Sequence, residues 1–230
     1  MKLKYIYHSS FCLEMENCTM IFDYYKGNIP EIDKNKKLYV FSSHSHNDHY
    51  NSEIFNIFAD YNVQFVLSDD IYVENEENRS RSIFVSPGNK YSIGEMEVET
   101  LESTDEGVAF IINTEGKTIY HSGDLNWWTW HGFESEEEFN SMTERFKREI
   151  SKIEGRKFDL AMMVLDYRQK ERYDWGMAYL LEHTDIKYLA PMHCWGKYEV
   201  IDKFRKDHES LLKNTVLIDT DKIAHQWYSV

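Results

Sequence analysis

Residues 38–49 read LYVFSSHSHNDH, an apolar run followed at once by four side chains that can bind a metal ion or carry a proton. Imidazole and carboxylate groups are costly to remove from water unless a partner compensates them. Four such groups within residues 44–49 are therefore hard to explain as plain structure. The apolar run predicts a buried strand, and the cluster behind it predicts a bound cation.

The spacing within this cluster favours two neighbouring cations. Side chains alternate along an extended segment, so His44 and His46 project to the same side. Asp48 and His49 then leave the turn that follows, toward the segment NSEIFNIF. Imidazoles combined with carboxylates suit zinc, iron or manganese, whereas calcium prefers an all-oxygen shell. We expect one or two ions of the first kind, zinc foremost.

Further polar residues follow other predicted strands. Asp124 follows KTIYHSG, Asp166 follows DLAMMVL, and His193 follows IKYLAPM. Ligand sites of layered α/β folds gather at the carboxyl ends of strands. The sequence therefore predicts that these three residues meet the histidine cluster.

The order of elements predicts sheets flanked by helices on their outer faces. Strands dominate the first half, and strands alternate with helices in the second. A capping box, Ser135 with Glu138, begins an amphipathic helix over residues 135–153, and Gly155 follows as a stop. We also expect helices over 51–62, around 177–183 and over 198–213, and strands over 2–8, 10–15, 18–24, 37–43, 63–68, 82–87, 95–101, 108–114, 117–123, 159–166, 186–193, 215–219 and 223–230.

The chain, residues 1–230, is expected to form a single domain, because no linker-like segment or internal repeat divides it. Forty acidic residues against 26 basic ones give a net charge of −14, which disfavours a nucleic-acid partner. No apolar run approaches the roughly 20 residues of a membrane span. The three cysteines are odd in number and predict reduced thiols. We therefore expect a cytoplasmic protein. A homo-oligomer is compatible with the sequence.

Through these motifs, the chain resembles the metallo-β-lactamase-fold hydrolases. The family signature HxHxDH appears as HSHNDH, and YHSGD and PMHCWG follow in the family's order. The resemblance begins at YHSSFCLEMENCTMIFDYYKG and extends over nearly the whole chain. It is strongest to the ascorbate-phosphate lactonase-like and phosphodiesterase-like branch, and implies a four-layer αββα sandwich with two mixed sheets.

The resemblance also implies a ligand set. His44 and His46 would hold one metal, and Asp48, His49 and His193 the other. Asp124 would bridge both, and Asp48 would also take or pass a proton during catalysis.

One position departs from the family pattern. The third histidine of the family should lie between residues 101 and 108, where this chain reads LESTDEGV and has no histidine. Asp105 or Glu106 is the candidate substitute as an oxygen ligand, and Asp105 is alternatively expected to contact substrate. Without a substitute, the first site is the weaker one.

Several residues near the motifs are candidates for supporting roles. His8, His121 and Trp195 could contact substrate or hold the ligands, and Asp166 with Arg168 could orient His193 or bind an anionic group. Trp127, Trp128 and Trp130 either pack in the core or form a pocket wall. Cys194 should point away from the metal by strand alternation. Four further histidines lack a partner motif and are expected to be structural or surface residues: His131, His183, His208 and His225.

The function implied is hydrolysis of a small anionic ester, phosphodiester or lactone by metal-activated hydroxide. A di-iron oxidoreductase, a nuclease of the same fold and a degenerate, non-catalytic metal- or ligand-binding protein are the rivals. The chain has no room for the flavin-binding domain that the di-iron oxidoreductases usually carry, and it has no basic surface for a nuclease. An amidohydrolase barrel fits the length and ligand order poorly. Metal content together with turnover separates an enzyme from a sensor.

Overall fold

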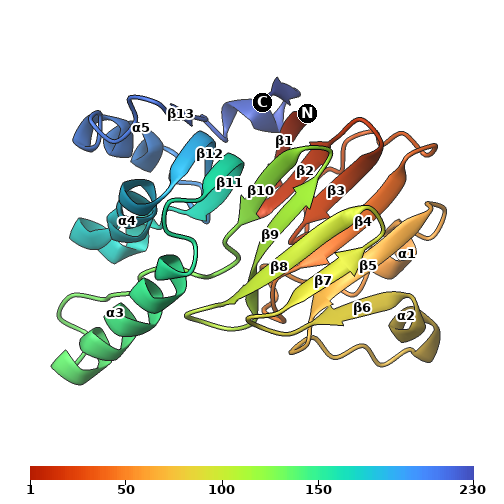
Figure 1. Ribbon diagram of the computed structural model, residues 1–230, viewed down its shortest axis with the longest axis horizontal. Helices are drawn as coiled ribbons and strands as arrows, with labels where there is room; N and C mark the ends of the chain where they lie inside the picture. The colour runs from red at the N-terminus through yellow and green to blue at the C-terminus, as the bar shows by residue number, and fades with distance from the viewer.

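The computed structural model describes residues 1–230 and contains two seven-stranded sheets that face each other (Figure 1). The first sheet has the order β14-β1-β2-β3-β4-β5-β6. It is antiparallel from β14 to β3 and parallel from β3 to β6, so it is a mixed sheet. Its strands are β1 (Lys2–Tyr7), β2 (Ser10–Glu14), β3 (Cys18–Phe22), β4 (Lys37–Ser42), β5 (Val63–Ser68), β6 (Ser82–Val85) and β14 (Tyr228–Ser229).

The second sheet has the order β13-β12-β11-β10-β9-β8-β7. Its pairs are antiparallel from β7 to β10 and parallel from β10 to β13. Both sheets are therefore mixed, as predicted. Its strands are β7 (Lys90–Ile93), β8 (Met96–Glu102), β9 (Val108–Thr114), β10 (Lys117–His121), β11 (Lys157–Val164), β12 (Asp185–Met192) and β13 (Val216–Leu217).

Helices lie outside the two sheets. In Figure 1, α3, α4 and α5 lie beside the second sheet, and α1 and α2 lie beyond the first. This arrangement confirms the predicted αββα sandwich. The helices are α1 (Ile54–Ile57), α2 (Glu76–Ser80), α3 (Glu136–Ser151), α4 (Trp175–His183) and α5 (Glu199–Asp207), with short 3-10 helices η1 (Tyr167–Arg172) and η2 (Lys222–Ala224).

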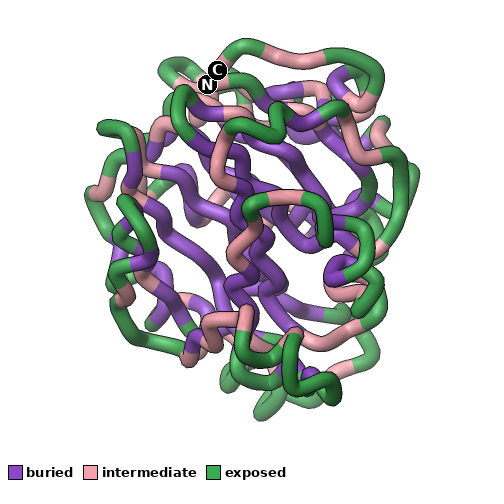
Figure 2. The backbone as a smooth tube through the Cα atoms, turned by 90° about the vertical axis from the view of Figure 1, so that its right-hand side faces the viewer, coloured by how far each residue is buried: buried purple, intermediate pink, exposed green.

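Apolar packing holds the layers together, and Figure 2 shows the buried backbone running through the middle of the molecule. Between the sheets, the rings of Phe41 and Phe110 lie 5.2 Å apart. Outside the second sheet, Phe146 of α3 belongs to a separate buried cluster, and outside the first sheet Phe55 packs on Phe65 at 4.5 Å. Full burial of one such ring contributes about 1.5–3 kcal/mol.

Helix α3 confirms the clearest local prediction. The Ser135 hydroxyl accepts a hydrogen bond from the Glu138 N–H, and the Glu138 carboxylate accepts one from the Ser135 N–H. Three acidic residues in the first turn complement the helix dipole.

Other predicted elements are shorter than expected. The helix over 51–62 is only one turn, because the N–H of Ala59 bonds to the Asn56 carbonyl in a tighter i to i+3 pattern and the chain then enters β5. The helix over 198–213 ends at Asp207, where the His208 ring turns to bond with Asp174. The strand over 215–219 shrinks to β13, and the strand over 223–230 is replaced by η2 and β14. Strand β7 and helix α2 were not predicted.

The topology brings four strand ends to one edge of the sandwich. Backbone hydrogen bonds join the two sheets there: the Val108 N–H donates to the Ser43 carbonyl at 2.9 Å, and the His193 N–H donates to the His8 carbonyl at 3.1 Å. A third bond, from His121 Nε2 at the end of β10 to the Ser9 carbonyl at 2.9 Å, ties β10 to the segment after β1. None of the helices reaches the length and apolar character that a bilayer crossing demands.

Candidate metal centre

Several residues at this edge of the sandwich leave their strands through unusual backbone conformations. His8 and His193 have φ of +56° and +63°, which non-glycine residues seldom adopt. Gly123, just before Asp124, has φ of +48°, and a Cβ there would lie 2.7 Å from the Val108 carbonyl oxygen. Such conformations persist only when the surroundings enforce them, and they cluster at functional sites.

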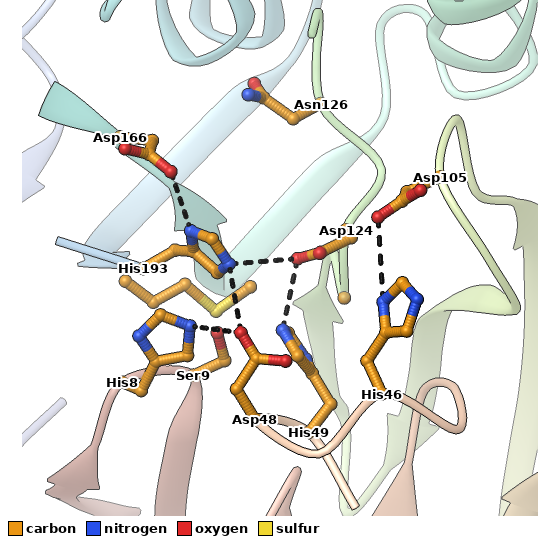
Figure 3. A network of polar contacts seen from close by, with 12 residues as sticks. His8, Ser9, His46, Asp48, His49, Asp105, Asp124, Asn126, Asp166 and His193 are labelled. Carbon is orange, nitrogen blue, oxygen red and sulfur yellow. Dashed lines mark hydrogen bonds and ion pairs between the residues drawn. The ribbon is translucent and has the colours of Figure 1, made fainter. Parts of the chain in front are cut away.

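Two groups of side chains converge at this edge (Figure 3). In each group the potential ligand atoms lie within 4.8 Å of one another. The four-residue group consists of His8, Asp48, His49 and His193, and the three-residue group consists of His44, His46 and Asp124.

Asp124 lies between the two groups. Its Oδ1 is 3.3 Å from His49 Nε2 and 3.7 Å from His193 Nε2, whereas its Oδ2 is 3.8 Å from His44 Nε2. Each oxygen thus faces a different group, which is the placement that a bridging carboxylate needs. The structure brings together all six predicted ligands and adds His8 to them.

The residues present fit a cation. The Nε2 atoms of His8, His44 and His49 and the Oδ1 atom of Asp124 are buried and have no hydrogen-bond partner. Orphaned polar atoms at such depth are unfavourable and need a ligand or ion to satisfy them. Nitrogen and carboxylate donors without sulfur suit zinc, manganese or iron. Cys194 stays outside the donor set, as predicted, because its buried thiol contacts the Met192 carbonyl.

The surroundings shift the pKa values of the imidazoles in different directions. Burial lowers the pKa of His8 and of His44 to about 4, so both rings are neutral at physiological pH. Burial also opposes charge on His49, but Asp124 and Asp23 outweigh it and raise the pKa of His49 to about 9. For Asp48, burial is outweighed by His8 and His49, which hold the pKa of that carboxyl well below its usual range.

Asp23 is a site residue that sequence reasoning missed. It is fully buried, and its carboxylate accepts hydrogen bonds from His49 Nδ1, from the Ser43 N–H and from the Ser43 hydroxyl, each at 2.7 Å. The Nδ1 contact fixes the His49 ring with Nε2 toward Asp124. It lies directly after β3, but the predicted strand over 18–24 included it, so it lacked the strand-end signal that marked Asp124.

Asp166 lies behind His193 as Asp23 lies behind His49. This is one of the two roles predicted for it, orienting His193. Its Oδ2 lies 3.0 Å from His193 Nδ1, and it also binds the Arg168 guanidinium through both carboxylate oxygens. Carboxylates behind ligating histidines orient the ring and raise its basicity.

His121 supports the loop rather than the ion. Its Nδ1 accepts a hydrogen bond from the Gly123 N–H, so Nε2 carries the proton that it donates to the Ser9 carbonyl at 2.9 Å. The ring also stacks on Phe22 at 5.0 Å. Both nitrogens are used, which leaves none for a metal.

The loop that should carry the third histidine lies over His46. Asp105 Oδ2 is 3.7 Å from His46 Nδ1, and Glu106 Oε2 is 3.4 Å from His46 Nε2. Neither carboxylate belongs to the two ligand groups. Partial burial and the charge of Asp124 raise the pKa of Asp105. That Asp105 substitutes for the histidine stays a prediction.

A cavity of about 500 Å³ opens beside the three-residue group. Arg168 is its only arginine or lysine, and the guanidinium lies 4.5 Å from the Trp195 ring and 5.9 Å from the Trp130 ring. Trp127 instead packs on Phe146 beneath α3. The cavity lining comprises His46, Asp48, Thr104, Asp105, Asp124, Trp128, Trp130, Met142, Arg168, His193 and Trp195.

The four remaining histidines lie away from the centre, as predicted. His131 contacts Glu171, His208 Nε2 lies 2.6 Å from Asp174, and His183 Nδ1 lies 2.8 Å from the Tyr179 carbonyl. None of them, nor His225, belongs to a ligand group.

Comparison with known proteins places the chain in a family. Residues 2–131 match the family described as the beta-lactamase superfamily domain. A protein from Nanoarchaeum equitans named as a metal-dependent hydrolase is 33% identical over 136 residues, which is 54% of this chain and 60% of that relative's length.

Solved structures share the fold at low identity. One, from Ignicoccus hospitalis and described as a metallo hydrolase, has a TM-score of 0.63 and 18% identity, covering 94% of this chain and 93% of the other. The metallo-β-lactamase fold protein YhfI of Bacillus subtilis has a TM-score of 0.56 and 13% identity, covering 94% and 95%. These likenesses concern the fold.

Proposed function

This chain belongs to the beta-lactamase superfamily, and we propose that it is a metal-dependent hydrolase of small anionic esters, phosphodiesters or lactones. The observation that carries the proposal is the pair of adjoining ligand groups, in which the ring nitrogens of His8, His44 and His49 are buried without a hydrogen-bond partner. Both groups reach the cavity, through His46 and Asp124 and through Asp48 and His193. A zinc, manganese or iron ion held there would supply Lewis-acid chemistry and activate water near neutral pH.

The protein's own residues would orient the reaction. Asp48 lines the cavity, and its low pKa keeps it ionised, so its oxygen can accept a hydrogen bond from an attacking water. The same low pKa weakens Asp48 as a base at neutral pH. We therefore assign Asp48 to orienting that water.

Arg168 supports the choice of an anionic substrate. One edge of its guanidinium is occupied by Asp166, but Nη1 makes no contact with that carboxylate and the side chain is 39% exposed. It is the only arginine or lysine that lines the cavity with Asp48, Asp105 and Asp124. An anion that approaches these carboxylates would find its partner there.

Trp130 and Trp195 flank Arg168 and extend the cavity wall. Their rings offer apolar area for the remainder of a small substrate. A nucleic acid would need many phosphate contacts, whereas one arginine on a chain of net charge −14 offers few, so a nuclease is disfavoured. A cytoplasmic location and self-association stay predictions.

The test combines metal content with turnover. Purified protein loaded with zinc, manganese or iron would be analysed by mass spectrometry and assayed with a nitrophenyl phosphodiester, a nitrophenyl carboxylate ester and an aliphatic lactone. We expect bound metal and metal-dependent hydrolysis of at least one substrate, with Arg168→Gln raising KM for anionic substrates more than for neutral ones. Bound metal without turnover of any would favour the non-catalytic alternative.

A further inference from the structure

His8 occupies a position that the sequence motif for metal binding does not include. It lies just after β1, where the pairing of β1 with β2 shifts register between Tyr5 and Tyr7. Its backbone carbonyl accepts the hydrogen bond from the His193 N–H, which ties it to the second sheet. Its side chain is only 2% exposed. A left-handed backbone at such a residue costs about 1–3 kcal/mol, so the surroundings must enforce it.

The His8 ring points at the ligands. Its Nε2 is 3.3 Å from Asp48 Oδ2, and its centroid is 4.1 Å from that of His193 and 5.7 Å from that of His49 (Figure 3). Ligand atoms bound at about 2.0–2.2 Å around a tetrahedral cation lie about 3.3–3.6 Å apart, so the contact with Asp48 has ligand spacing. The same Nε2 makes no hydrogen bond.

We propose that His8 Nε2 is a direct metal ligand, which completes a four-residue site with Asp48, His49 and His193. This inference rests on the proposed metal dependence. The alternative is that His8 only pairs with Asp48 and holds it in place. In that role the His8 ring would contact Asp48 alone, at 3.3 Å, whereas a cation would be shared among His8, Asp48, His49 and His193, whose ligand atoms all lie within 4.8 Å of one another.

The number of protein ligands differs between the two groups. Sites with four protein ligands are closed, whereas catalytic sites keep a position open for water or substrate. The four-residue group would therefore be the closed site. Both groups line the cavity, the four-residue group through Asp48 and His193 and the three-residue group through His46 and Asp124. An open position in the three-residue group would therefore be reached from the cavity.

The first experiment uses the unaltered protein. Crystals loaded with zinc would be measured at the zinc absorption edge, and we expect an anomalous peak about 2.0–2.2 Å from His8 Nε2. A zinc ion on Asp48, His49 and His193 with the His8 nitrogen beyond about 3 Å would overturn the inference, since no bond spans that distance.

The second experiment measures affinity. Asparagine tolerates the left-handed backbone but is too short to reach the ion, so His8→Asn is the test and His131→Asn is the control for loss of a surface histidine. In competition with a chelator, we expect the tighter zinc affinity of His8→Asn to fall by more than about 100-fold, beyond the range for an outer partner. A smaller fall overturns the inference, and if His8→Asn does not fold, the anomalous map decides.

Hydrolysis is scored separately. Zinc on His8 without turnover of any substrate leaves this inference intact and removes the proposed function. Turnover with zinc out of reach of His8 would support the proposed function and overturn this inference.

Discussion

Asp23 and His49 form a fully buried pair, with Asp23 Oδ2 2.7 Å from His49 Nδ1. Burial would raise the pKa of Asp23, but the imidazoles of His121 and His49 outweigh it and hold that pKa at about 2. The carboxylate therefore stays charged behind a ligating ring, where it fixes the ring's orientation and increases its basicity.

Asp23→Asn should weaken metal binding although Asp23 never touches the ion. The amide keeps the shape of the side chain but removes the charge, so we expect a loss of about 10- to 100-fold in metal affinity. Competition titration against a chelator measures it. Asp185→Asn, which removes an exposed partner of Lys157, is the matched control and should leave the affinity unchanged. Equal affinities for the two variants would contradict the assignment.

The metal-free protein should be most stable near pH 6.5. His49 has a pKa of about 9 when folded against about 6.5 when unfolded, so the folded state binds more protons between these values and stability falls as the pH rises from 6.5 to 9. His8 and His44 have the opposite sign: their folded pKa of about 4 makes stability rise from pH 4 to 6.5.

Denaturant titrations of the metal-free protein across this range check the profile. Asp23→Asn should flatten the fall above pH 6.5, because it removes part of what raises the pKa of His49. Metal binding should show the reverse trend, tightening as the pH rises, since ligands must release protons. Stability of the metal-free protein that climbs steadily from pH 6.5 to 9 would disprove the assignment.

The sequence predicted those site residues that several features mark together, and missed those that one feature or none marks. HSHNDH, Asp124 and His193 each combine a metal-binding side chain with a strand end, and the structure brings all of them together. Asp23 was missed because it fell inside the predicted strand over 18–24 rather than at its end, and its partner His49 lies 26 residues away. His8 was placed nearby but not among the ligands, because its ring position depends on a β-bulge that no motif encodes.

The same distinction holds for the fold. Helix α3 was predicted within two residues because a capping box and a long apolar period coincide there. The segment over 51–62 has apolar residues at helical spacing, but its tertiary contacts need only Ile54, Phe55 and Phe58 buried, and one turn suffices. Strand β7 has only four residues, too few for periodicity to reveal it.

Asp124→Asn should lower hydrolysis by at least about 100-fold, the scale for losing a charged group that positions the chemistry. The amide retains one oxygen, so it can face only one of the two groups that Asp124 now faces with separate oxygens. Rates would be measured on protein whose metal content is known, with Asp185→Asn as the control. A metal-loaded Asp124→Asn variant that turns over at the rate of the unaltered protein would refute the bridging role.

Asp105→Asn should reduce occupancy of the three-residue group more than Glu106→Gln does. Both carboxylates approach His46, but Asp105 lines the cavity and Glu106 does not. Metal stoichiometry by mass spectrometry after limited chelation distinguishes them. If both variants retain the stoichiometry of the unaltered protein, neither residue replaces the missing histidine.

The two groups should hold metal unequally, with the four-residue group the tighter. The three-residue group offers two histidines and the shared Asp124, so water must fill the positions that protein ligands leave. The four-residue group keeps Asp48, His49 and His193 even if His8 contributes nothing, and Asp124 Oδ1 lies within 3.7 Å of His193 Nε2. As chelator is added, the three-residue group should therefore lose its ion first.

Variants in each group identify which ion leaves. His44→Ala should abolish the weaker binding step and keep the tighter one, whereas His193→Ala should remove the tighter step, with metal counted by mass spectrometry at each chelator concentration. Both histidines are almost fully buried, so both substitutions leave comparable cavities and each serves as the control for the other. If His44→Ala loses all metal while His193→Ala retains its full complement, the order of the sites is reversed, and the loop over residues 103–107 must contribute more to binding than its distances from His46 indicate.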